Sequence, residues 1–533
     1  MARERMGRVD HAWLRMDNPN NWMIITGLMT LGSPLDVERL KDVVQTSLLK
    51  HRRFRQRLVW SRLPAGRPYW EEDPHFNLNA HIERIILPEP ADQANLQALV
   101  SEVMSHGLDY DRPLWCFYVV ENYAHGGALI ARLHHCLADG VALVRVLLSM
   151  TDTSPETQHQ PVELPELTHL DRPHDHHWLE ETLGLIPAAL RDTAQLAGEA
   201  ARLGVETLED PASLLEKARL GGELLTAAGK LALRWPDNPT IFRGPLGHAK
   251  RAAWSQPLRI DQVKAIGRAH GATVNDVLLT AVAGALRSYL LYRDQAVEDL
   301  SIRGFIPVNL RPLEKAIELG NKFGLVFLSL PLGIADPIHR LRALKRNMDD
   351  IKSSKEAIAS FGILHLIGSV PLWLQGIAMN IFDAKGTAVM TNVPGPNQPL
   401  YLCGVPVETT MAWVPQSGRV SMGVSILSYD GNVWLGVATD NNLVPDPERI
   451  VAYFETEFDA MSSRAAKVME KRQAPVKPLL AQLDAALSEL DGLLAEHHRQ
   501  VAPSGCQAQT RSGNACKNPP LAGKKYCRVH LPK

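Results

Sequence analysis

The chain has 533 residues, 45% of them hydrophobic and 22% charged, and its formal net charge is −1. One hydrophobic core rarely serves a chain this long, so we expect two large domains with an appendage, and the composition excludes a disordered or fibrous protein. A net charge so close to zero gives no overall field that would attract nucleic acid or anionic lipid.

The first 60 residues predict a helix and turn, then a strand, then a second helix. Residues 23–31 form an apolar run typical of a strand, and residues 36–48 place Leu and Val at helical spacing. The basic cluster at 51–57 could contact nucleic acid, but the sheet-like residues after it favour a strand with its charged side facing water. The charged start of the chain shows no secretory signal, and the six cysteines do not form a disulfide framework, so we expect a reducing cytoplasm.

After a helix at 92–107, a hairpin is predicted from strands at 116–121 and 128–133. The second strand ends in two adjacent histidines, and a helix is expected from 140 to 150. The residues of this junction are His134, His135, Cys136, Leu137, Ala138, Asp139 and Gly140.

The histidine pair has two alternative roles. A neutral imidazole can take a proton from a hydroxyl or thiol, and a nearby carboxylate such as Asp139 can hold the loop or the ring in one orientation. Histidines at strand ends are also common as hydrogen-bonded core residues, and Asp-Gly is an ordinary turn. The pattern alone does not decide between catalysis and packing.

The centre of the chain predicts an exposed linker at 151–176, rich in Pro, His, Thr and Glu, and amphipathic bridging helices at 178–208 and 211–233. The second half alternates strands and helices. Strands are predicted at 250–257, 300–307, 325–332 and 389–393, with an antiparallel meander over 401–440 and helices from 261, at 277–291, from 338 and at 447–461.

One uncharged segment, residues 357–382, is long enough to span a bilayer. Its Ser, His, Gln and Asn residues and Pro371 argue against a spanning helix. We expect a buried or interfacial helix broken near Pro371, with Trp373 as a candidate interface anchor.

Several motifs together resemble the bacterial wax ester synthase/acyl-CoA:diacylglycerol acyltransferase family, and the set is specific although each motif is weak. The motifs are the junction His134 to Gly140, Pro113-Leu114-Trp115, Asn275-Asp276, residues 307–311, the loop 391–396 and the opening from Asp10 to Pro19. The resemblance implies an α/β fold, an α+β sandwich, in which two chloramphenicol-acetyltransferase-like halves joined by a helical linker meet around a channel to the second histidine. It also implies an acyl-CoA donor, a fatty alcohol or diacylglycerol acceptor, and no cofactor for catalysis.

On this resemblance we expect five parts. They are an N-terminal acyltransferase half (1–150), a linker with bridging helices (151–240), a C-terminal acyltransferase half (241–470), a helix (471–503) and a small tail (504–533). An enzyme that joins a long acyl chain to a lipid alcohol must reach a lipid surface. We therefore expect a cytoplasmic protein peripherally associated with membrane or lipid bodies, with the uncharged segment serving that contact.

The resemblance implies roles for the residues of the junction. His135 would act as general base on the acceptor hydroxyl, and His134 would position His135 or line the channel. Asp139 would fix the loop, for example by pairing with Arg311. Cys136 would pack and not act as a nucleophile, because no acyl-enzyme is needed.

Other motif residues keep two roles open. Asn275 is a candidate hydrogen-bond donor to the oxyanion, or simply an N-cap of the following helix, as Thr273 could also be. Pro113-Leu114-Trp115 would shape an acyl pocket or merely pack in the core. Asp276 and Gly140 are expected to be structural.

The end of the chain carries a second signal, outside that family pattern. A helix is predicted at 477–500, with a leucine stripe too short for a long zipper. The last 30 residues then supply three thiols and an imidazole, the ligand types of a closed tetrahedral zinc site. These residues are Cys506, Cys516, Cys527 and His530.

A segment so poor in core residues needs a metal to fold, and the tail resembles small Cys3His zinc knuckles; chance clustering of cysteines is the alternative. No acidic residue stands between 504 and 533, so the basic tail could contact phosphates, CoA or another protein. We expect structural zinc and a protein partner for the tail, and no nucleic acid for the main body.

The sequence is therefore compatible with three functions. The first is an O-acyltransferase that forms wax ester or triacylglycerol from acyl-CoA. The second is a condensation-type transferase with a carrier-bound acyl donor, and the third is a non-catalytic lipid-binding scaffold. The intact histidine motif argues against the third.

Overall fold

The computed structural model describes residues 3–61, 66–138, 140–156, 234–309, 323–352, 383–416, 418–473, 476–501, 506–519, 521 and 524–530. The chain divides into two compact units, Met1–Ser463 and Arg464–Lys533. Most of the predicted linker, both predicted bridging helices and the uncharged segment 357–382 lie outside the described residues.

The first sheet of the larger unit carries the histidine pair. Its described strands are, in spatial order, β5 (Ile82–Ile85), β6 (Trp115–Val120), β7 (Gly127–His134), β2 (Ile24–Leu31), β15 (Val405–Trp413), β14 (Tyr401–Leu402) and β8 (Thr151–Asp152). Strands β6 and β7 form the predicted antiparallel hairpin, and β2 pairs antiparallel with the other side of β7. Every residue of β7 is buried, which explains its nearly unbroken apolar run.

The second sheet is built mainly from the second half of the chain. Its described strands run in the order β10 (Leu258–Arg259), β17 (Asn432–Asp440), β16 (Met422–Tyr429), β13 (Ala388–Pro394), β11 (Ile302–Asn309) and β12 (Phe323–Leu330), and β9 (Lys250–Trp254) also pairs with β17. Strand β13 is parallel to both β11 and β16, whereas β11 and β12 are antiparallel.

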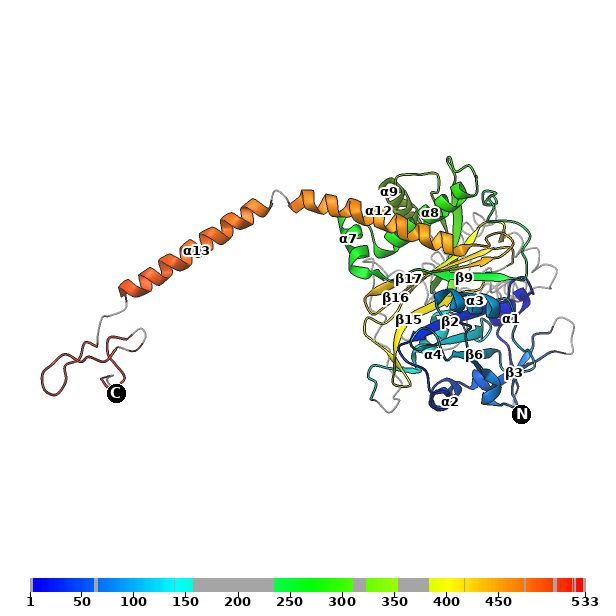
Figure 1. Ribbon diagram of the computed structural model, residues 1–533, viewed down its shortest axis with the longest axis horizontal. Coiled ribbons are helices and arrows are strands. Elements are labelled where there is room, and N and C mark those ends of the chain that lie inside the picture. The colour runs from blue at the N-terminus through cyan, green and yellow to red at the C-terminus, as the bar shows by residue number, and fades with distance from the viewer. Residues whose placement is uncertain are drawn as a thin grey trace, which may run out of the picture. The chain divides into compact units, whose positions relative to one another are not determined.

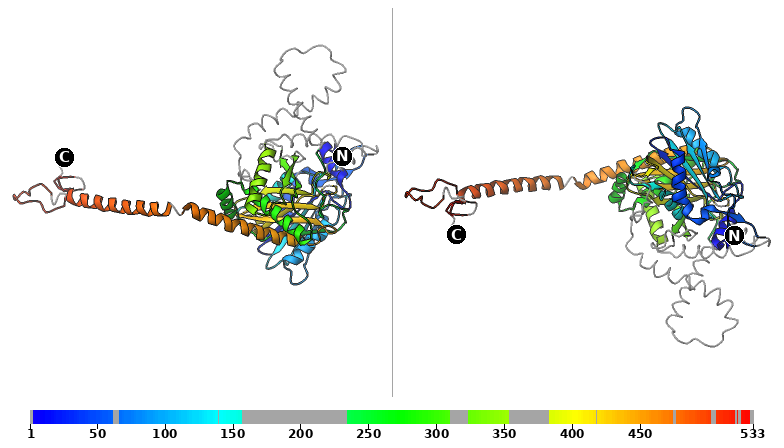
Figure 2. Two further views of the ribbon diagram at one scale, coloured as in Figure 1. Left: turned by 90° about the horizontal axis from the view of Figure 1, so that it is seen from above. Right: turned by 90° about the horizontal axis from the view of Figure 1, so that it is seen from below.

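The predicted meander over 401–440 is wrong in one respect, because β15 leaves it. Strands β16 and β17 pair antiparallel as expected, but β15 pairs with β2 of the first sheet, with Met411 opposite Leu28. The blue strand β2 and the yellow strand β15 lie side by side in Figures 1 and 2. Met411 and Trp413 are buried in the core of the first half. Alternation in the sequence shows that a strand has a buried face, but it does not show which sheet the strand joins. Strand β15 comes from the second half of the sequence and belongs to the first sheet, and its local pattern could not predict this.

Helices cover the second sheet. The predicted helices of this half are α7 (Ile260–His270), α8 (Val274–Tyr292), α9 (Pro337–Lys352) and α12 (Pro447–Gln473). Helices α7, α8 and α9 lie together in Figure 1, and α9 packs on β12. Within the described part of the chain, α8 is the one helix long and apolar enough to cross a membrane, but 78% of that stretch is buried inside the protein. We therefore interpret α8 as a core helix.

Helix α3 (Gln93–Met104) joins the two halves at the edge strand β9. The hydroxyl of Ser101 accepts the backbone N–H of Ala252 at 2.9 Å, and the hydroxyl of Ser105, which follows the helix, accepts that of Lys250 at 2.8 Å. These hydrogen bonds satisfy backbone N–H groups of β9 that would otherwise have no partner at the edge of the sheet.

The basic cluster at 51–57 is only partly a strand. Arg52–Arg55 form a short 3-10 helix, and β3 (Gln56–Val59) begins after it and pairs with β4 (Tyr69–Glu72), which in turn pairs with β1 (Glu4–Arg5). The cations meet carboxylates of this small sheet in the ion pairs Arg53–Glu4, Arg52–Glu72, Arg55–Glu72 and Arg57–Glu71. Internal pairing with Glu4, Glu71 and Glu72 offsets much of the positive charge of the cluster, which agrees with the preference for a solvated structural element over a nucleic-acid patch.

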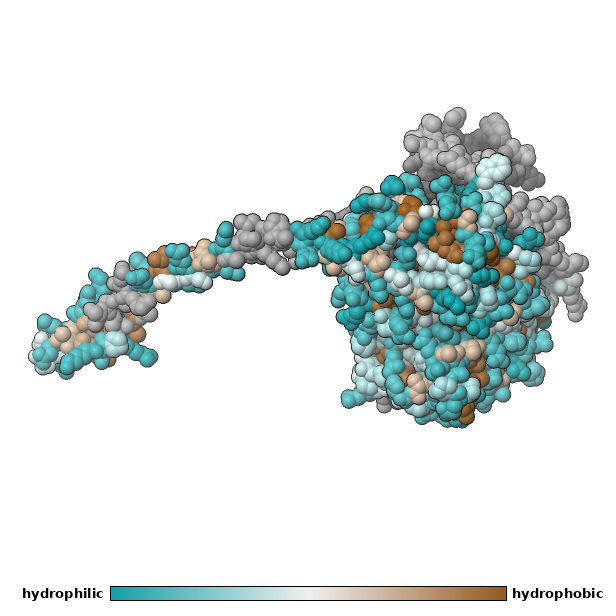
Figure 3. Space-filling model, turned by 45° about the horizontal axis from the view of Figure 1, so that its top comes forward, coloured by the Kyte–Doolittle hydropathy of each residue, from teal (hydrophilic) through white to brown (hydrophobic). Residues whose placement is uncertain are grey.

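The larger unit contains further short elements. Helices α2 (Val37–Thr46) and α4 (Gly140–Leu148) confirm two predicted helices, and η1 (Leu48–Lys50) and η3 (Leu78–His81) are single turns. On the face shown in Figure 3, hydrophilic residues predominate and apolar ones are scattered among the described residues.

In the smaller unit, α13 (Val476–Val501) confirms the predicted helix. Its leucine stripe is solvent-exposed, with about half of each side chain accessible at Leu483, Leu487, Leu490 and Leu494. The helix leads to the cysteine-rich tail, whose three cysteines are buried.

Candidate active site and metal centre

The histidine pair stands at the end of the central strand β7, where the backbone of both residues is fixed. The N–H of His134 donates to the carbonyl of Leu114 at 3.0 Å, and the N–H of His135 donates to the carbonyl of Met23 at 2.7 Å. The side chains are buried, with 0% of His134 and 5% of His135 exposed. The prediction that the pair ends the second strand of a hairpin is confirmed.

The ring of His134 has a hydrogen bond at one nitrogen atom and a carboxylate near the other. The backbone N–H of Cys136 donates to Nδ1 at 3.1 Å, so Nδ1 carries no proton and the neutral ring carries it on Nε2. Nε2 lies 3.3 Å from Oδ2 of Asp17, and both side chains are nearly inaccessible to solvent. The N–H direction at Nε2 does not meet the geometry of a hydrogen bond in this conformation, so the contact is one of charge proximity.

The ring of His135 is supported by an aromatic side chain of helix α1 (Arg8–Met16). The rings of Trp13 and His135 are stacked, with centroids 4.2 Å apart and planes 19° apart. Stacking fixes the plane of the imidazole and places a π face where it favours a protonated ring. Trp13 also packs with Met16 and Met23, which lie beside Leu325 of β12, so residues of both halves meet here.

Cys136 is unsuited to nucleophilic attack. Its side chain is fully buried, and burial, followed by the negative charges of Asp10 and Asp17, raises the pKa of the thiol well above its ordinary value. The thiol stays protonated at neutral pH, which agrees with the packing role expected for Cys136.

Two motif residues cannot be placed. Asp139 and Arg311 lie outside the described residues, so their expected pairing stays a prediction. Gly140 begins α4, and a Cβ atom there would meet Ile25 and Val414 at an ordinary 3.9 Å. There is therefore room for a Cβ atom at this position, and packing alone does not require glycine here.

Leu114 and Trp115 pack in the core of the first half, where both are almost fully buried. The indole N–H of Trp115 donates to the carbonyl of Phe54 at 2.8 Å, and its ring stacks on His81 with centroids 4.4 Å apart. Leu114 contributes through its carbonyl, which accepts the N–H of His134. The packing alternative explains these contacts, and a role in shaping an acyl pocket stays a prediction.

The start of α8 separates the roles of its three polar residues. Thr273 is the N-cap: its hydroxyl accepts the N–H of Asp276 at 3.2 Å, and Oδ2 of Asp276 accepts the N–H of Thr273 at 2.9 Å. This capping box gives Asp276 the structural role expected for it. Asn275 is not the cap. Its Oδ1 accepts Nδ2 of Asn392 at 3.1 Å, and its own NH2 group donates no hydrogen bond within the described residues.

Asn275 and Asn392 line a cavity of about 250 Å³ in the second half. Apolar side chains form much of its wall, including Leu278, Leu279, Ile306 and Met390. Asn275 has no hydrogen bond to either histidine among the described residues.

The last residues of β13 and the loop that follows them border this cavity and a second, smaller one. Thr391, Asn392 and Pro394 line the large cavity, whereas Val393, Gly395 and Pro396 line an apolar cavity of about 40 Å³ beside β2, β7 and α4. A Cβ atom at Gly395 would collide with the carbonyl oxygen of Ser428. Glycine is therefore required where this loop crosses β16.

The sequence analysis missed the contribution of α1. The resemblance included the opening from Asp10, but it assigned no role to Trp13 or Asp17. Asp10, Trp13 and Asp17 are spaced three and four residues apart, which places Asp10 and Trp13 on one face of α1 and Asp17 directly after its last residue. That spacing is the signal that could have connected this helix with the histidine pair.

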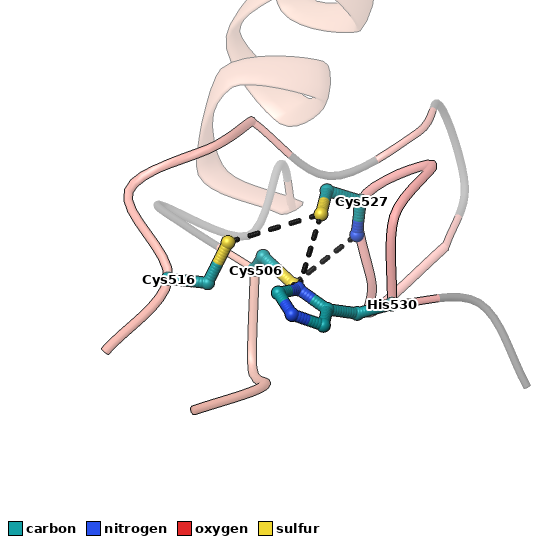
Figure 4. A group of neighbouring side chains, drawn as sticks. All are labelled: Cys506, Cys516, Cys527 and His530. Atoms are coloured by element: carbon teal, nitrogen blue, oxygen red, sulfur yellow. Dashed lines mark hydrogen bonds between the residues drawn. The ribbon is translucent and has the colours of Figure 1, made fainter. Parts of the chain in front are cut away.

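The tail brings the four predicted metal ligands together (Figure 4). The ligand atoms of Cys506, Cys516, Cys527 and His530 all lie within 4.8 Å of one another. The Cys516 and Cys527 sulfurs are 3.8 Å apart, too far for a disulfide, and Nδ1 of His530 is 3.3 Å and 3.7 Å from the Cys527 and Cys506 sulfurs. A zinc ion about 2.3 Å from each thiolate sets tetrahedral edges of about 3.8 Å. The group therefore fits a four-coordinate metal ion.

Two family models match the chain. The model described as the wax ester synthase/diacylglycerol acyltransferase catalytic domain matches residues 6–278, and the one described as the WS/DGAT C-terminal domain matches residues 319–462. A protein of Mycobacterium tuberculosis named as a probable diacylglycerol O-acyltransferase is 27% identical over 433 residues, 79% of this chain and 88% of the relative. A second protein of that organism with the same description is 28% identical over 399 residues, 73% of this chain and 83% of the relative.

Solved structures show the same fold. The wax ester synthase/diacylglycerol acyltransferase from Marinobacter aquaeolei VT8 has a TM-score of 0.62 at 22% identity and covers 87% of this chain and all of its own. The first condensation domain of the calcium-dependent antibiotic synthetase has a TM-score of 0.54 at 14% identity, covering 88% of this chain and 99% of its own. The expected α/β fold with two sheet-bearing halves is confirmed.

Proposed function

The chain belongs to the wax ester synthase/diacylglycerol acyltransferase family, and on that basis we propose that it transfers a long-chain acyl group from acyl-CoA to the hydroxyl of diacylglycerol or a fatty alcohol. The observation that carries the proposal is the buried histidine pair, fixed at the end of β7 in the fold of this family. The mycobacterial relatives, named as diacylglycerol O-acyltransferases, favour diacylglycerol as the first acceptor to test.

In the proposed mechanism the imidazole of His135 acts as general base. It takes the proton of the acceptor hydroxyl while the oxygen attacks the thioester carbonyl carbon. When the tetrahedral intermediate collapses, the C–S bond breaks and the imidazolium gives its proton to the CoA thiolate. The buried, protonated thiol of Cys136 takes no part, so no acyl-enzyme forms.

The developing oxyanion needs a donor, and we propose the amide group of Asn275. Asn392 engages its Oδ1, which fixes the amide plane and directs the NH2 group away from Asn392. The cavity that Asn275 lines is mostly apolar, where a single donor stabilises charge more than it would in water.

Substitutions at α8 separate this role from helix capping. Asn275→Ala is expected to lower kcat about a hundredfold with little change in Tm, as the loss of one oxyanion donor does. Thr273→Ala removes the cap and is expected to cost about 1 kcal/mol of stability with little change in kcat. Steady-state kinetics and thermal unfolding of both variants check this. Equal losses of kcat in the two variants would show that the helix start acts only through stability.

A substrate panel tests the proposed function. CoA release is measured with palmitoyl-CoA and, in turn, diacylglycerol, hexadecanol or no acceptor, with the products identified by mass spectrometry. We expect ester formation at the rate of CoA release. Turnover with a carrier-bound acyl group and none with acyl-CoA would instead assign a condensation-type transferase, and tight lipid binding without turnover of either donor would assign a scaffold.

We also propose that the tail holds a structural zinc ion. The support is its set of three thiols and one imidazole at tetrahedral spacing, in a segment whose buried side chains are chiefly the cysteines themselves. No catalytic step is assigned to this metal. Its expected effect is to fold the tail, because a segment this small lacks a sufficient hydrophobic core.

A further inference from the structure

We propose that Asp17 is a positioning residue that holds both histidines of the active site, from outside the histidine motif. This inference rests on the proposed function, because it concerns the same site. Asp17 directly follows helix α1 and is more than a hundred residues from the histidine pair in the sequence. No sequence motif connects them; the fold does.

One carboxylate reaches both histidines. Oδ2 of Asp17 lies 3.3 Å from Nε2 of His134, which is the side-chain contact. Oδ1 accepts the backbone N–H of Met23 at 2.6 Å, and the carbonyl of Met23 accepts the N–H of His135 at 2.7 Å. Asp17 therefore orients the first ring directly and the backbone of the second histidine through a single residue.

Burial makes this contact matter energetically. Only 6% of the Asp17 side chain and none of the His134 side chain are exposed, so water screens the charge very little. Because Nδ1 of His134 accepts the N–H of Cys136, the ring proton lies on Nε2, the nitrogen nearest the carboxylate. The 3.3 Å contact is electrostatic, and loss of the carboxylate removes the charged group that favours this ring orientation.

The same helix completes the support of the second histidine. Trp13, one turn before Asp17, stacks on the His135 ring. Helix α1 and the residue that follows it thus limit the orientation of both rings: Asp17 places a carboxylate beside His134, and Trp13 places an aromatic face on His135. A misplacement of about 1 Å in a catalytic group can cost about a hundredfold in rate.

The competing account is that Asp17 only stabilises the fold. It predicts that removing the carboxylate lowers Tm but leaves the turnover of the folded enzyme unchanged. Its effect would also be independent of His134, because a general loss of stability adds to any local defect. Kinetics in the presence and absence of the His134 ring separate the two accounts.

The experiment compares Asp17→Asn, Asp17→Glu, His134→Gln and the double variant Asp17→Asn/His134→Gln in the full chain. Palmitoyl-CoA and diacylglycerol are the substrates, and Tm is measured for each protein. Asp237→Asn is the matched control. Asp237 is a similarly buried carboxylate, bonded to Thr387 and the backbone N–H of Arg303 in the second half and not to the histidine pair.

We expect Asp17→Asn to lower kcat tenfold to about a hundredfold, with KM changed less than about twofold, and Asp17→Glu to recover part of the loss. In the His134→Gln background the same substitution should cost less than about twofold, because the amide oxygen that replaces Oδ1 can still accept the N–H of Met23 and so preserves the support of His135. Asp237→Asn should lower Tm without lowering kcat. An unchanged kcat in folded Asp17→Asn, or a full additional loss in the double variant, would overturn the proposal. A wild-type chain inactive with every donor and acceptor would instead reject the proposed function.

Discussion

Replacing His135 with alanine is expected to lower kcat by about a thousandfold, within the range that a positioned general base contributes. The reason is geometric: its backbone is fixed by Met23 and its ring plane by Trp13, so the imidazole is held in one position, and alanine leaves no base at that position. KM for acyl-CoA should change little, because the base acts on the acceptor hydroxyl. The measurement is steady-state CoA release at saturating diacylglycerol.

Cys136→Ala is the matched control for that substitution. Cys136 is adjacent and equally buried, but its protonated thiol has no part in the mechanism. We expect a stability loss of about 1 kcal/mol, from a small cavity, with kcat within about threefold of wild type. The mechanism would be wrong if His135→Ala turned over normally, or if Cys136→Ala lost activity to the same extent while remaining folded.

Removing the metal from the tail is expected to unfold it completely. Structural zinc contributes about 10–16 kcal/mol of binding energy in small Cys/His domains, far more than the tail could draw from apolar burial. The purified chain should contain one zinc ion, and chelation should release it and make the Cys506, Cys516 and Cys527 thiols reactive toward a thiol reagent. Acyl transfer by the larger unit should persist, since the tail forms part of a separate compact unit.

Substitution of a ligand gives the same result without a chelator. Cys516→Ser should abolish stoichiometric zinc, whereas Cys116→Ser, at a half-buried cysteine of the larger unit, should leave the zinc content unchanged. Retention of a full equivalent of zinc by Cys516→Ser would exclude this site, and equal loss in both variants would place the metal elsewhere.

Local patterns predicted much of the fold. The hairpin of β6 and β7, the helix α4 and the apolar helix α8 follow from periodicity that each segment carries itself. The tail ligands were also predictable, because thiols and an imidazole in a short segment have few other uses. Long-range pairing was not predictable: the alternation of β15 shows its buried face but cannot show that β2 is its neighbour.

The candidate site was predicted only in part, because some of its residues are brought together by long-range contacts. The motif located His134 and His135, but Trp13 and Asp17 come to them only through the fold. The basic cluster at 51–57 contains a 3-10 turn that strand propensity does not reveal. At the start of α8, both Thr273 and Asn275 are cap-forming residue types, and only the capping box between Thr273 and Asp276 decides between them.

Direct transfer to the acceptor is the central claim, and it is tested most directly by leaving the acceptor out. The wild-type chain is mixed with one equivalent of palmitoyl-CoA without diacylglycerol, and free CoA and the intact protein mass are measured over time. General-base catalysis by His135 predicts no rapid release of CoA and no acylated protein until diacylglycerol is added, after which both CoA and triacylglycerol appear. A stoichiometric burst of CoA with a protein mass increased by one acyl group would contradict it, because it would require a covalent acyl-enzyme.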